Sequence, residues 1–193
     1  MLKIVGVLAV QGDFKEHIEA LNELEGVEAR PVKTREQIEA CDALVIPGGE
    51  STTIGTLMER FELDKPVREM VEVGKPIWGT CAGMIVLAKD IVGSEQWRLG
   101  LMDITVERNA FGRQVDSFEV DLPVEGIDDP VRAVFIRAPY VREVCKACGV
   151  EVLAEFDGKI VLCRQGKLLA SAFHPEMTDD RRVQQYFVGM IEE

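Results

Sequence analysis

The residue best suited to chemistry in this chain is Cys81, which lies between glycines in the segment Gly-Thr-Cys-Ala-Gly at residues 79–83. The segment follows a short apolar strand pattern at residues 75–78 and precedes a helical pattern. Glycines on both sides allow a tight strand-to-helix turn that pushes the side chain clear of the sheet, and the N-terminus of a helix stabilises a thiolate. These features predict a nucleophilic cysteine. The alternative is a small core residue, because free cysteines are commonly buried.

A nucleophilic cysteine needs a base, and the chain has only two histidines. His17 lies inside a helical pattern among charged residues, which indicates a surface or helix-packing residue. His174 follows the strand pattern at residues 169–173 and precedes Pro175, which restricts it to an extended conformation, so Glu176 and His174 point to the same side. The pattern predicts a Cys81–His174–Glu176 triad in which the carboxylate orients the imidazole. Glu176 could alternatively be an acid that leads into a helix.

A second glycine turn, Ile-Pro-Gly-Gly-Glu-Ser-Thr-Thr at residues 46–53, follows a buried strand pattern. Two glycines at a strand end allow close approach of the backbone and an oriented N–H group, as an oxyanion hole requires. We predict that the backbone amides of Gly49 and Ala82 form this hole. The alternative is a glycine turn leading to a helix capped by Ser51 or Thr52.

The five cysteines are odd in number and irregularly spaced, which predicts reduced thiols in place of a disulfide framework. Cys145 and Cys148 form a single C-x-x-C motif. Without a second pair or nearby histidines it falls short of a zinc site, and its place after a strand-rich stretch does not suit a thioredoxin-like role. We therefore predict no metal site.

Hydrophobic periodicity predicts the elements that position these residues. Strands are expected at residues 4–10, 27–32, 43–46 and 75–78, with helices at 14–24, 34–38, 57–73 (interrupted at Pro66) and 84–89. In the second half, strands are expected at 104–106, 118–120, 133–136, 152–156, 160–163 and 168–173, with hairpin turns at 157–158 and 165–166 and a helix at 179–191. This order predicts an α/β fold whose sheet is parallel first and antiparallel later.

The 193 residues are 47% hydrophobic, which is enough for one core and predicts a single domain over residues 1–193. The net charge of −12 argues against nucleic acid and anionic lipid as ligands. No apolar run approaches the roughly 20 residues of a membrane helix, and residues 1–5 lead into a strand pattern without a signal peptide. We expect no membrane association and a cytoplasmic location.

The motifs at residues 47–52, 79–83 and 173–176 together resemble those of the class I (triad) glutamine amidotransferases. More closely, residues 8–12 with Glu16 and His17, and residues 47–53, 106–119 and 135–139, resemble the glutaminase subunits of pyridoxal 5'-phosphate synthases. The resemblance runs nearly end to end, and residues 106–119 are its most specific part. It implies a flavodoxin-like, three-layer α/β/α fold with a mainly parallel central sheet and antiparallel strands in the second half.

The resemblance also implies a reaction. Cys81 would attack the side-chain amide of L-glutamine to give a glutamyl thioester and ammonia, with His174 as base and acid. Carried over position by position, Gly49, Glu50 and Ser51 would contact glutamine, and Arg108, Ile136 and Arg137 would close the site. An arginine suits this task because a guanidinium holds a carboxylate through two hydrogen bonds, although either arginine could instead form a surface ion pair.

The implied partner is the synthase subunit, a ring-forming β/α barrel that uses the ammonia to build pyridoxal 5'-phosphate. That compound would be the product of the pathway, so no cofactor is expected in this chain. The resemblance further implies a glutaminase that is weak until it docks, which is physically reasonable if docking completes the oxyanion hole.

Three other functions are considered. One is the glutaminase subunit of another pathway, such as imidazole glycerol phosphate synthase, against which residues 50–52 and 108–114 argue. Another is a cysteine hydrolase or peptidase on a related fold, which would act on peptides and not on glutamine. The last is a non-catalytic interaction module, which would show no glutamine hydrolysis even with its partner.

Overall fold

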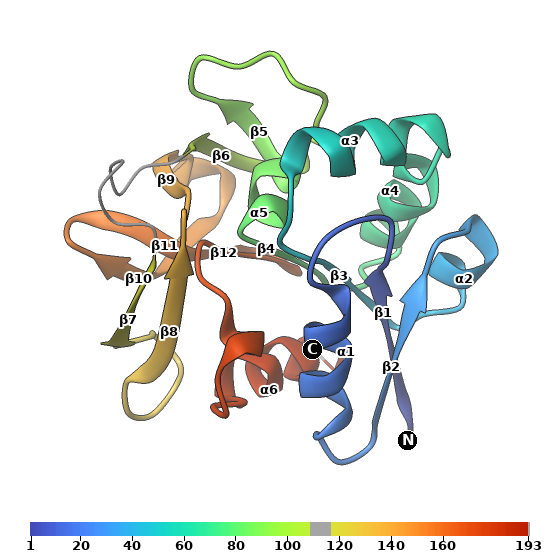
Figure 1. Cartoon of the computed structure of the whole chain (residues 1–193), viewed down its shortest axis with the longest axis horizontal. Coiled ribbons are helices and arrows are strands. Elements are labelled where there is room, and N and C mark those ends of the chain that lie inside the picture. Colours follow the sequence, from blue (N-terminus) through green and yellow to red (C-terminus); the bar gives the residue numbers. More distant parts are fainter. Residues whose placement is uncertain (109–116, 193) are drawn as a thin grey trace.

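The computed structural model describes residues 1–108 and 117–192 (Figure 1). Its first half contains β1 (Lys3–Leu8), α1 (Phe14–Asn22), β2 (Val27–Val32), α2 (Arg35–Glu39), β3 (Ala43–Ile46), α3 (Ser51–Arg60), α4 (Asp64–Glu72), β4 (Ile77–Thr80), α5 (Ala82–Leu87) and β5 (Ala88–Ile91). Its second half contains β6 (Met102–Glu107), β7 (Ser117–Leu122), β8 (Val131–Ile136), β9 (Tyr140–Val144), η1 (Lys146–Cys148), β10 (Val150–Phe156), β11 (Lys159–Gln165), β12 (Leu168–Ser171), η2 (Pro175–Met177) and α6 (Arg182–Gly189).

The main sheet has the strand order β2-β1-β3-β4-β12-β11-β9-β6-β5, with β10 added on β11. The strands from β2 to β12 pair in parallel, whereas β11 is antiparallel to β12, β10 and β9, and β6 is antiparallel to β9. Strands β7 and β8 form a separate hairpin. The predicted α/β class, with a mainly parallel sheet and later antiparallel strands, is confirmed.

Helices cover both faces of the parallel part. Figure 1 shows α1 and α6 on one side of the sheet and α3, α4 and α5 on the other. Trp78 of β4 packs against His17 of α1 and Phe187 of α6, which fixes these two helices to the same face. Strands β3, β4 and β12 are buried at every position because helices cover them above and below.

Most predicted elements are present, and the differences have local causes. The helix predicted at residues 57–73 is two helices, which break at residues 61–63 where Glu62 has a left-handed backbone (φ 53°). Pro66 does not interrupt a helix. It lies in the first turn of α4, where a proline's missing N–H costs no hydrogen bond.

Two strands were not predicted. Residues 88–91, assigned partly to a helix, form β5, and residues 140–144 form β9. Both contain charged residues, and pairing with β6 gives them their extended structure. The hairpin turns at 157–158 and 165–166 are confirmed by the registers of β10, β11 and β12.

The expectation of five reduced cysteines was wrong for one pair, since Cys145 and Cys148 form a disulfide around η1. Cysteines three residues apart can meet when the chain makes a single helical turn between them. Cys41, Cys81 and Cys163 are free thiols. Within residues 1–108 and 117–192, no helix is long and apolar enough to cross a membrane.

Candidate active site

Cys81 lies at the predicted strand-to-helix turn, between β4 and α5. Its backbone has φ 48° and ψ −102°, a strained conformation that non-glycine residues adopt mainly at functional sites. Its N–H donates to the carbonyl of Ser171 in the neighbouring β12, at 2.7 Å. A Cβ atom at position 83 would lie only 1.9 Å from the carbonyl oxygen of Ile46, so the turn requires Gly83. The side chain of Cys81 is mostly buried but borders a cavity.

His174 and Glu176 lie where β12 leads into η2. The backbone N–H of His174 donates to the carbonyl of Val134 in β8, at 2.8 Å, which fixes the start of this segment. Its Nδ1 lies 2.6 Å from Oε1 of Glu176, and both side chains are buried. Cys81 and His174 line the same cavity, and Cys81 is among the groups that raise the pKa of His174. The structure therefore brings together the three residues that the sequence predicts as a triad.

Two further side chains from the start of α1 reach the same place. Asp13 Oδ2 lies 3.0 Å from Nδ1 of His174. His17 Nε2 lies 3.4 Å from Oε2 of Glu176 and 2.9 Å from the hydroxyl of Thr80. Sequence reasoning missed both residues. Of the two alternatives predicted for His17, a surface or a helix-packing residue, the second is confirmed, because the side chain is fully buried and packs against Trp78.

The electrostatics of His174 follow from these carboxylates. Burial by itself would lower the pKa of His174, but hydrogen bonds with Asp13, Cys81 and Glu176 outweigh it and raise the pKa to about 12. For Asp13, burial would raise the pKa, and the interaction with His174 overcomes this and lowers it to about 2. At neutral pH the site therefore contains an imidazolium beside the carboxylate of Asp13.

The cavity that Cys81 borders has a volume of about 440 Å³. It is lined by every substrate-binding residue that the sequence predicts: Gly49, Glu50, Ser51, Arg108, Ile136 and Arg137. His174, Ala82 and Asp13 also line it. Residues 109–116, part of the most specific motif, lie outside the described part of the chain.

The glycine turn forms one wall of the cavity. Gly49 has φ 145°, and a Cβ there would lie 2.6 Å from Oε1 of Gln11, so the turn needs glycine. The same Gln11 oxygen accepts a hydrogen bond from the N–H of Glu50 at 2.8 Å. The cap of α3 is Glu50 itself, whose carboxylate accepts from the N–H of Thr53, and not Ser51 or Thr52 as considered from sequence.

A glutamine side chain links two of the predicted binding residues. Gln96 Nε2 donates to the hydroxyl of Ser51 at 3.1 Å, and Gln96 Oε1 accepts from Nη1 of Arg108 at 2.8 Å. The guanidinium of Arg108 is thus held at the cavity wall. Gln96 has no motif around it, and only the fold brings it close to Ser51.

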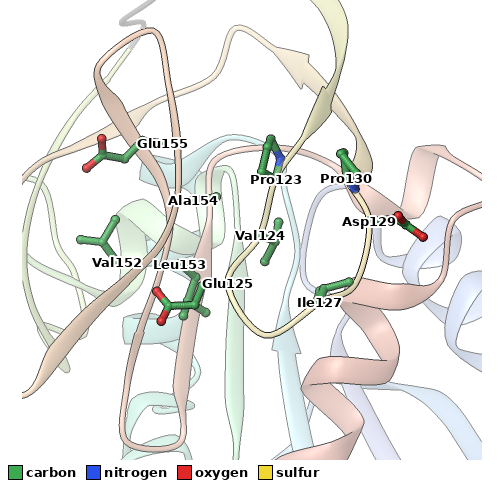
Figure 2. Close-up of a pocket in the computed structure, with 10 residues that line it drawn as sticks. All are labelled: Pro123, Val124, Glu125, Ile127, Asp129, Pro130, Val152, Leu153, Ala154 and Glu155. Carbon is green, nitrogen blue, oxygen red and sulfur yellow. The ribbon is translucent and has the colours of Figure 1, made fainter.

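A larger cavity of about 680 Å³ lies between the loop after β7 and strand β10 (Figure 2). Its charged lining residues are Glu125, Asp129 and Glu155, and its other lining residues are apolar. It has no nucleophile, histidine or cation among its lining residues. The smaller cavity is therefore the candidate active site on chemical grounds.

Comparisons with known proteins identify the family of this chain. Residues 7–193 match the SNO glutamine amidotransferase family. The chain is 58% identical over 189 residues to pyridoxal 5'-phosphate synthase subunit PdxT of Moorella thermoacetica, covering 97% of this chain and 98% of that protein. It is also 58% identical to the protein of the same name from Desulforudis audaxviator, over the full length of both.

Solved structures give the same result. A crystal structure described as a glutamine amidotransferase matches with a TM-score of 0.92 and 54% identity, over 98% of this chain and 99% of that one. The structure of PurLQS from Thermotoga maritima matches with a TM-score of 0.75 at 19% identity and supports the fold alone. The resemblance inferred from the motifs is confirmed, and the chain belongs to the SNO glutamine amidotransferase family.

Proposed function

We propose that this chain hydrolyses L-glutamine to L-glutamate and ammonia as the glutaminase subunit of a pyridoxal 5'-phosphate synthase, with Cys81, His174 and Glu176 as its catalytic triad. The observation that carries the proposal is the cavity of about 440 Å³ bordered by Cys81, with His174 and all six predicted substrate-binding residues in its wall. The full-length similarity to subunits that bear the synthase name supports the pathway.

The first half of the reaction forms a thioester. The thiolate of Cys81 attacks the carboxamide carbon of glutamine, and the carbonyl π electrons move to the oxygen. His174, as an imidazolium, gives its proton to the amide nitrogen as the C–N bond breaks and ammonia leaves. Glu176 holds the imidazole and stabilises its positive charge.

The second half regenerates the enzyme. Neutral His174 takes a proton from a water molecule, whose oxygen attacks the thioester carbon. The C–S bond then breaks, glutamate leaves, and Cys81 returns as a thiolate beside the imidazolium. We assign the backbone amides of Gly49 and Ala82 to the negative oxygen of both tetrahedral intermediates, because both residues border the cavity beside the nucleophile.

The charges of the cavity suit the two ends of an amino acid. Arg108 and Arg137 offer guanidinium groups to the α-carboxylate, and the carboxylate of Glu50 faces the α-ammonium group. Hydrogen bonds with Thr52 hold the pKa of Glu50 below its usual range, so this carboxylate stays ionised at neutral pH. Ser51 and Ile136 complete the wall on which the glutamine chain lies.

The ammonia would pass to a separate synthase subunit, a β/α barrel in the family, for incorporation into pyridoxal 5'-phosphate. The relatives are named as subunits of a synthase, which supports a partner subunit. The hydrolysis itself uses protein groups and water, so the proposal includes no cofactor and no metal. A cytoplasmic location and a single domain over residues 1–193 remain predictions.

Replacement of the nucleophile tests the function. In a glutaminase assay with the synthase subunit from the same genome, Cys81→Ala should abolish glutamate production, while circular dichroism and thermal unfolding stay close to wild type because little packing is lost. The matched control is Cys163→Ala. Burial raises the pKa of that thiol to about 12, so it cannot serve as a nucleophile, and turnover should persist. Turnover in the Cys81→Ala protein would exclude the mechanism.

A further inference from the structure

The start of helix α1 contributes two side chains to the active site that the proposed mechanism does not use. Asp13 is the N-cap residue of α1, and His17 follows one helical turn later. Residues four apart lie on the same face of a helix, so one face of α1 carries both groups. This face meets the η2 segment that carries Glu176.

Asp13 has a conformation that its position in the helix does not explain. An aspartate at an N-cap normally accepts a hydrogen bond from the backbone of the first turn, which stabilises a helix by about 1 kcal/mol. The side chain of Asp13 makes no such bond. Its Oδ2 lies instead 3.0 Å from Nδ1 of His174, and its buried Oδ1 has no hydrogen-bond partner. The carboxylate is therefore directed into the active site at the expense of capping.

His17 lies on the other side of the His174–Glu176 pair, and its placement is equally specific. Its ring is fully buried and packs edge-on against Trp78, with the centroids 5.8 Å apart. Its Nε2 lies between Oε2 of Glu176, at 3.4 Å, and the hydroxyl of Thr80, at 2.9 Å. Thr80 is the residue directly before the nucleophile. His17 thus joins the backbone that carries Cys81 to the carboxylate that orients His174.

The carboxylate of Glu176 needs a hydrogen-bond donor beside it. Its Oε1 interacts with His174, but its buried Oε2 forms no hydrogen bond with good geometry, and a buried carboxylate oxygen without a donor is costly. Nε2 of His17 lies 3.4 Å from this oxygen, so the tautomer that carries its proton on Nε2 would place a donor beside it. A shift of about 1 Å in a catalytic group can lower the rate about 100-fold, so a residue that fixes Glu176 controls catalysis without touching substrate.

We propose that Asp13 and His17 are positioning residues that bracket the His174–Glu176 pair, Asp13 on the imidazole and His17 on the free oxygen of the carboxylate. The proposal rests on the triad function proposed above. It assigns the first turn of α1 to the catalytic apparatus, in addition to its packing on the sheet.

The test of His17 compares two polar substitutions with an apolar one, in the complex with the synthase subunit. The amide nitrogen of glutamine can take the place of Nε2, whereas that of asparagine takes the place of Nδ1 and falls short of Glu176. His17→Leu and His17→Asn should lower kcat about 10-fold to 100-fold with KM changed less than about threefold, and His17→Gln should recover most of kcat. Leu21→Ala, on the same buried face of α1, is the control for lost packing.

The pH profile separates positioning from packing. The groups that face His174 are Asp13 from α1, Cys81 from the β4–α5 turn and Glu176 from η2, with His17 beyond Glu176 and Arg108, Arg137 and Glu50 across the cavity. Since His174 must carry a proton to release ammonia, activity falls at high pH as the imidazolium loses it. Asp13→Asn and His17→Leu should move this basic limb to lower pH by at least half a unit, and Leu21→Ala should leave it in place.

The outcomes distinguish the two proposals. If Cys81→Ala is inactive while His17→Leu and Leu21→Ala show equal kcat and the same basic limb, His17 only packs, and the positioning proposal is overturned. Equal activities of the glutamine and asparagine variants would overturn it as well. If Cys81→Ala retains turnover, the triad itself is wrong. If the His17→Leu protein folds poorly, the activities of His17→Gln and His17→Asn are compared instead. That comparison alone decides whether His17 positions Glu176.

Discussion

At the scale of single residues, the active site depends on how a few buried charges are paired. Residue type and local spacing select Cys81, His174 and Glu176 as the proposed triad, because the glycines around Cys81 and the His-Pro-Glu motif are informative without a structure. Asp13 and His17 could not be predicted in the same way. His17 has charged neighbours in sequence, which suggested a surface or helix-packing residue, and the signals for a further role were its spacing of four from Asp13 and its place in a motif that carries the resemblance.

The pairing of Asp13 with His174 predicts a pH-dependent stability. The pKa of Asp13 falls from 3.8 to about 2 on folding, so its contribution is present above about pH 4 and is lost as the pH falls toward 2. The pKa of His174 rises from 6.5 to about 12, so its contribution is complete below pH 6.5 and is lost as the pH rises toward 12. Both contributions are therefore present between about pH 4 and 6.5.

Asp13→Asn should accordingly lower the free energy of unfolding by about 2 kcal/mol at pH 6, with the difference shrinking below pH 4. Urea unfolding at several pH values measures this. Asp157→Asn is the control, because Asp157 lies at the exposed tip of the β10–β11 hairpin with φ 50°, which asparagine tolerates. A deficit in Asp13→Asn that stays constant from pH 6 to pH 3 would contradict the pairing.

At the scale of elements, the strand-to-helix turn between β4 and α5 presents Cys81, the proposed nucleophile. The glycine-flanked sequence at residues 79–83 predicted this turn. The apolar patterns likewise predicted the strands that are buried on both faces. Strands β5 and β9 were missed because their charged residues carry no clear alternation, and their extended structure comes from pairing with β6. The disulfide between Cys145 and Cys148 was missed because spacing alone does not reveal how the chain turns.

Close packing at this turn predicts a strong effect of one methyl group. Gly83→Ala would place a Cβ 1.9 Å from the carbonyl oxygen of Ile46, and neither backbone can move freely. We expect a loss of about 3 kcal/mol in the free energy of unfolding, together with a loss of activity. Gly189→Ala is the matched control.

At position 189, near the end of α6, a Cβ meets nothing within 4 Å, so the control should gain about 0.5 to 1 kcal/mol. Urea unfolding of both proteins checks the pair of predictions. Equal stabilities of the two variants would show that the turn between β4 and α5 is not tightly packed around Gly83.

At the scale of the whole molecule, the parallel half of the sheet creates the site. The segments after β1, β3, β4 and β12 supply Asp13, Gly49, Cys81 and His174, and neighbouring parallel strands end at the same edge. Arg108 and Arg137 come from the second half, after β6 and β8, and close the cavity. The sequence predicted Gly49, Cys81, His174 and both arginines through motifs, but not Asp13. Gln96, which ties Ser51 to Arg108, depends on long-range contacts and was not predictable.

The central claim is that Cys81 forms a covalent glutamyl intermediate with glutamine. It is tested most directly by mixing the assembled complex with glutamine, quenching with acid within milliseconds and locating the adduct by mass spectrometry of peptides. We predict a glutamyl group on the Cys81 peptide that appears and decays at the rate of turnover and is absent from Cys81→Ala. Turnover with no adduct, or an adduct on Cys41 or Cys163, would contradict it.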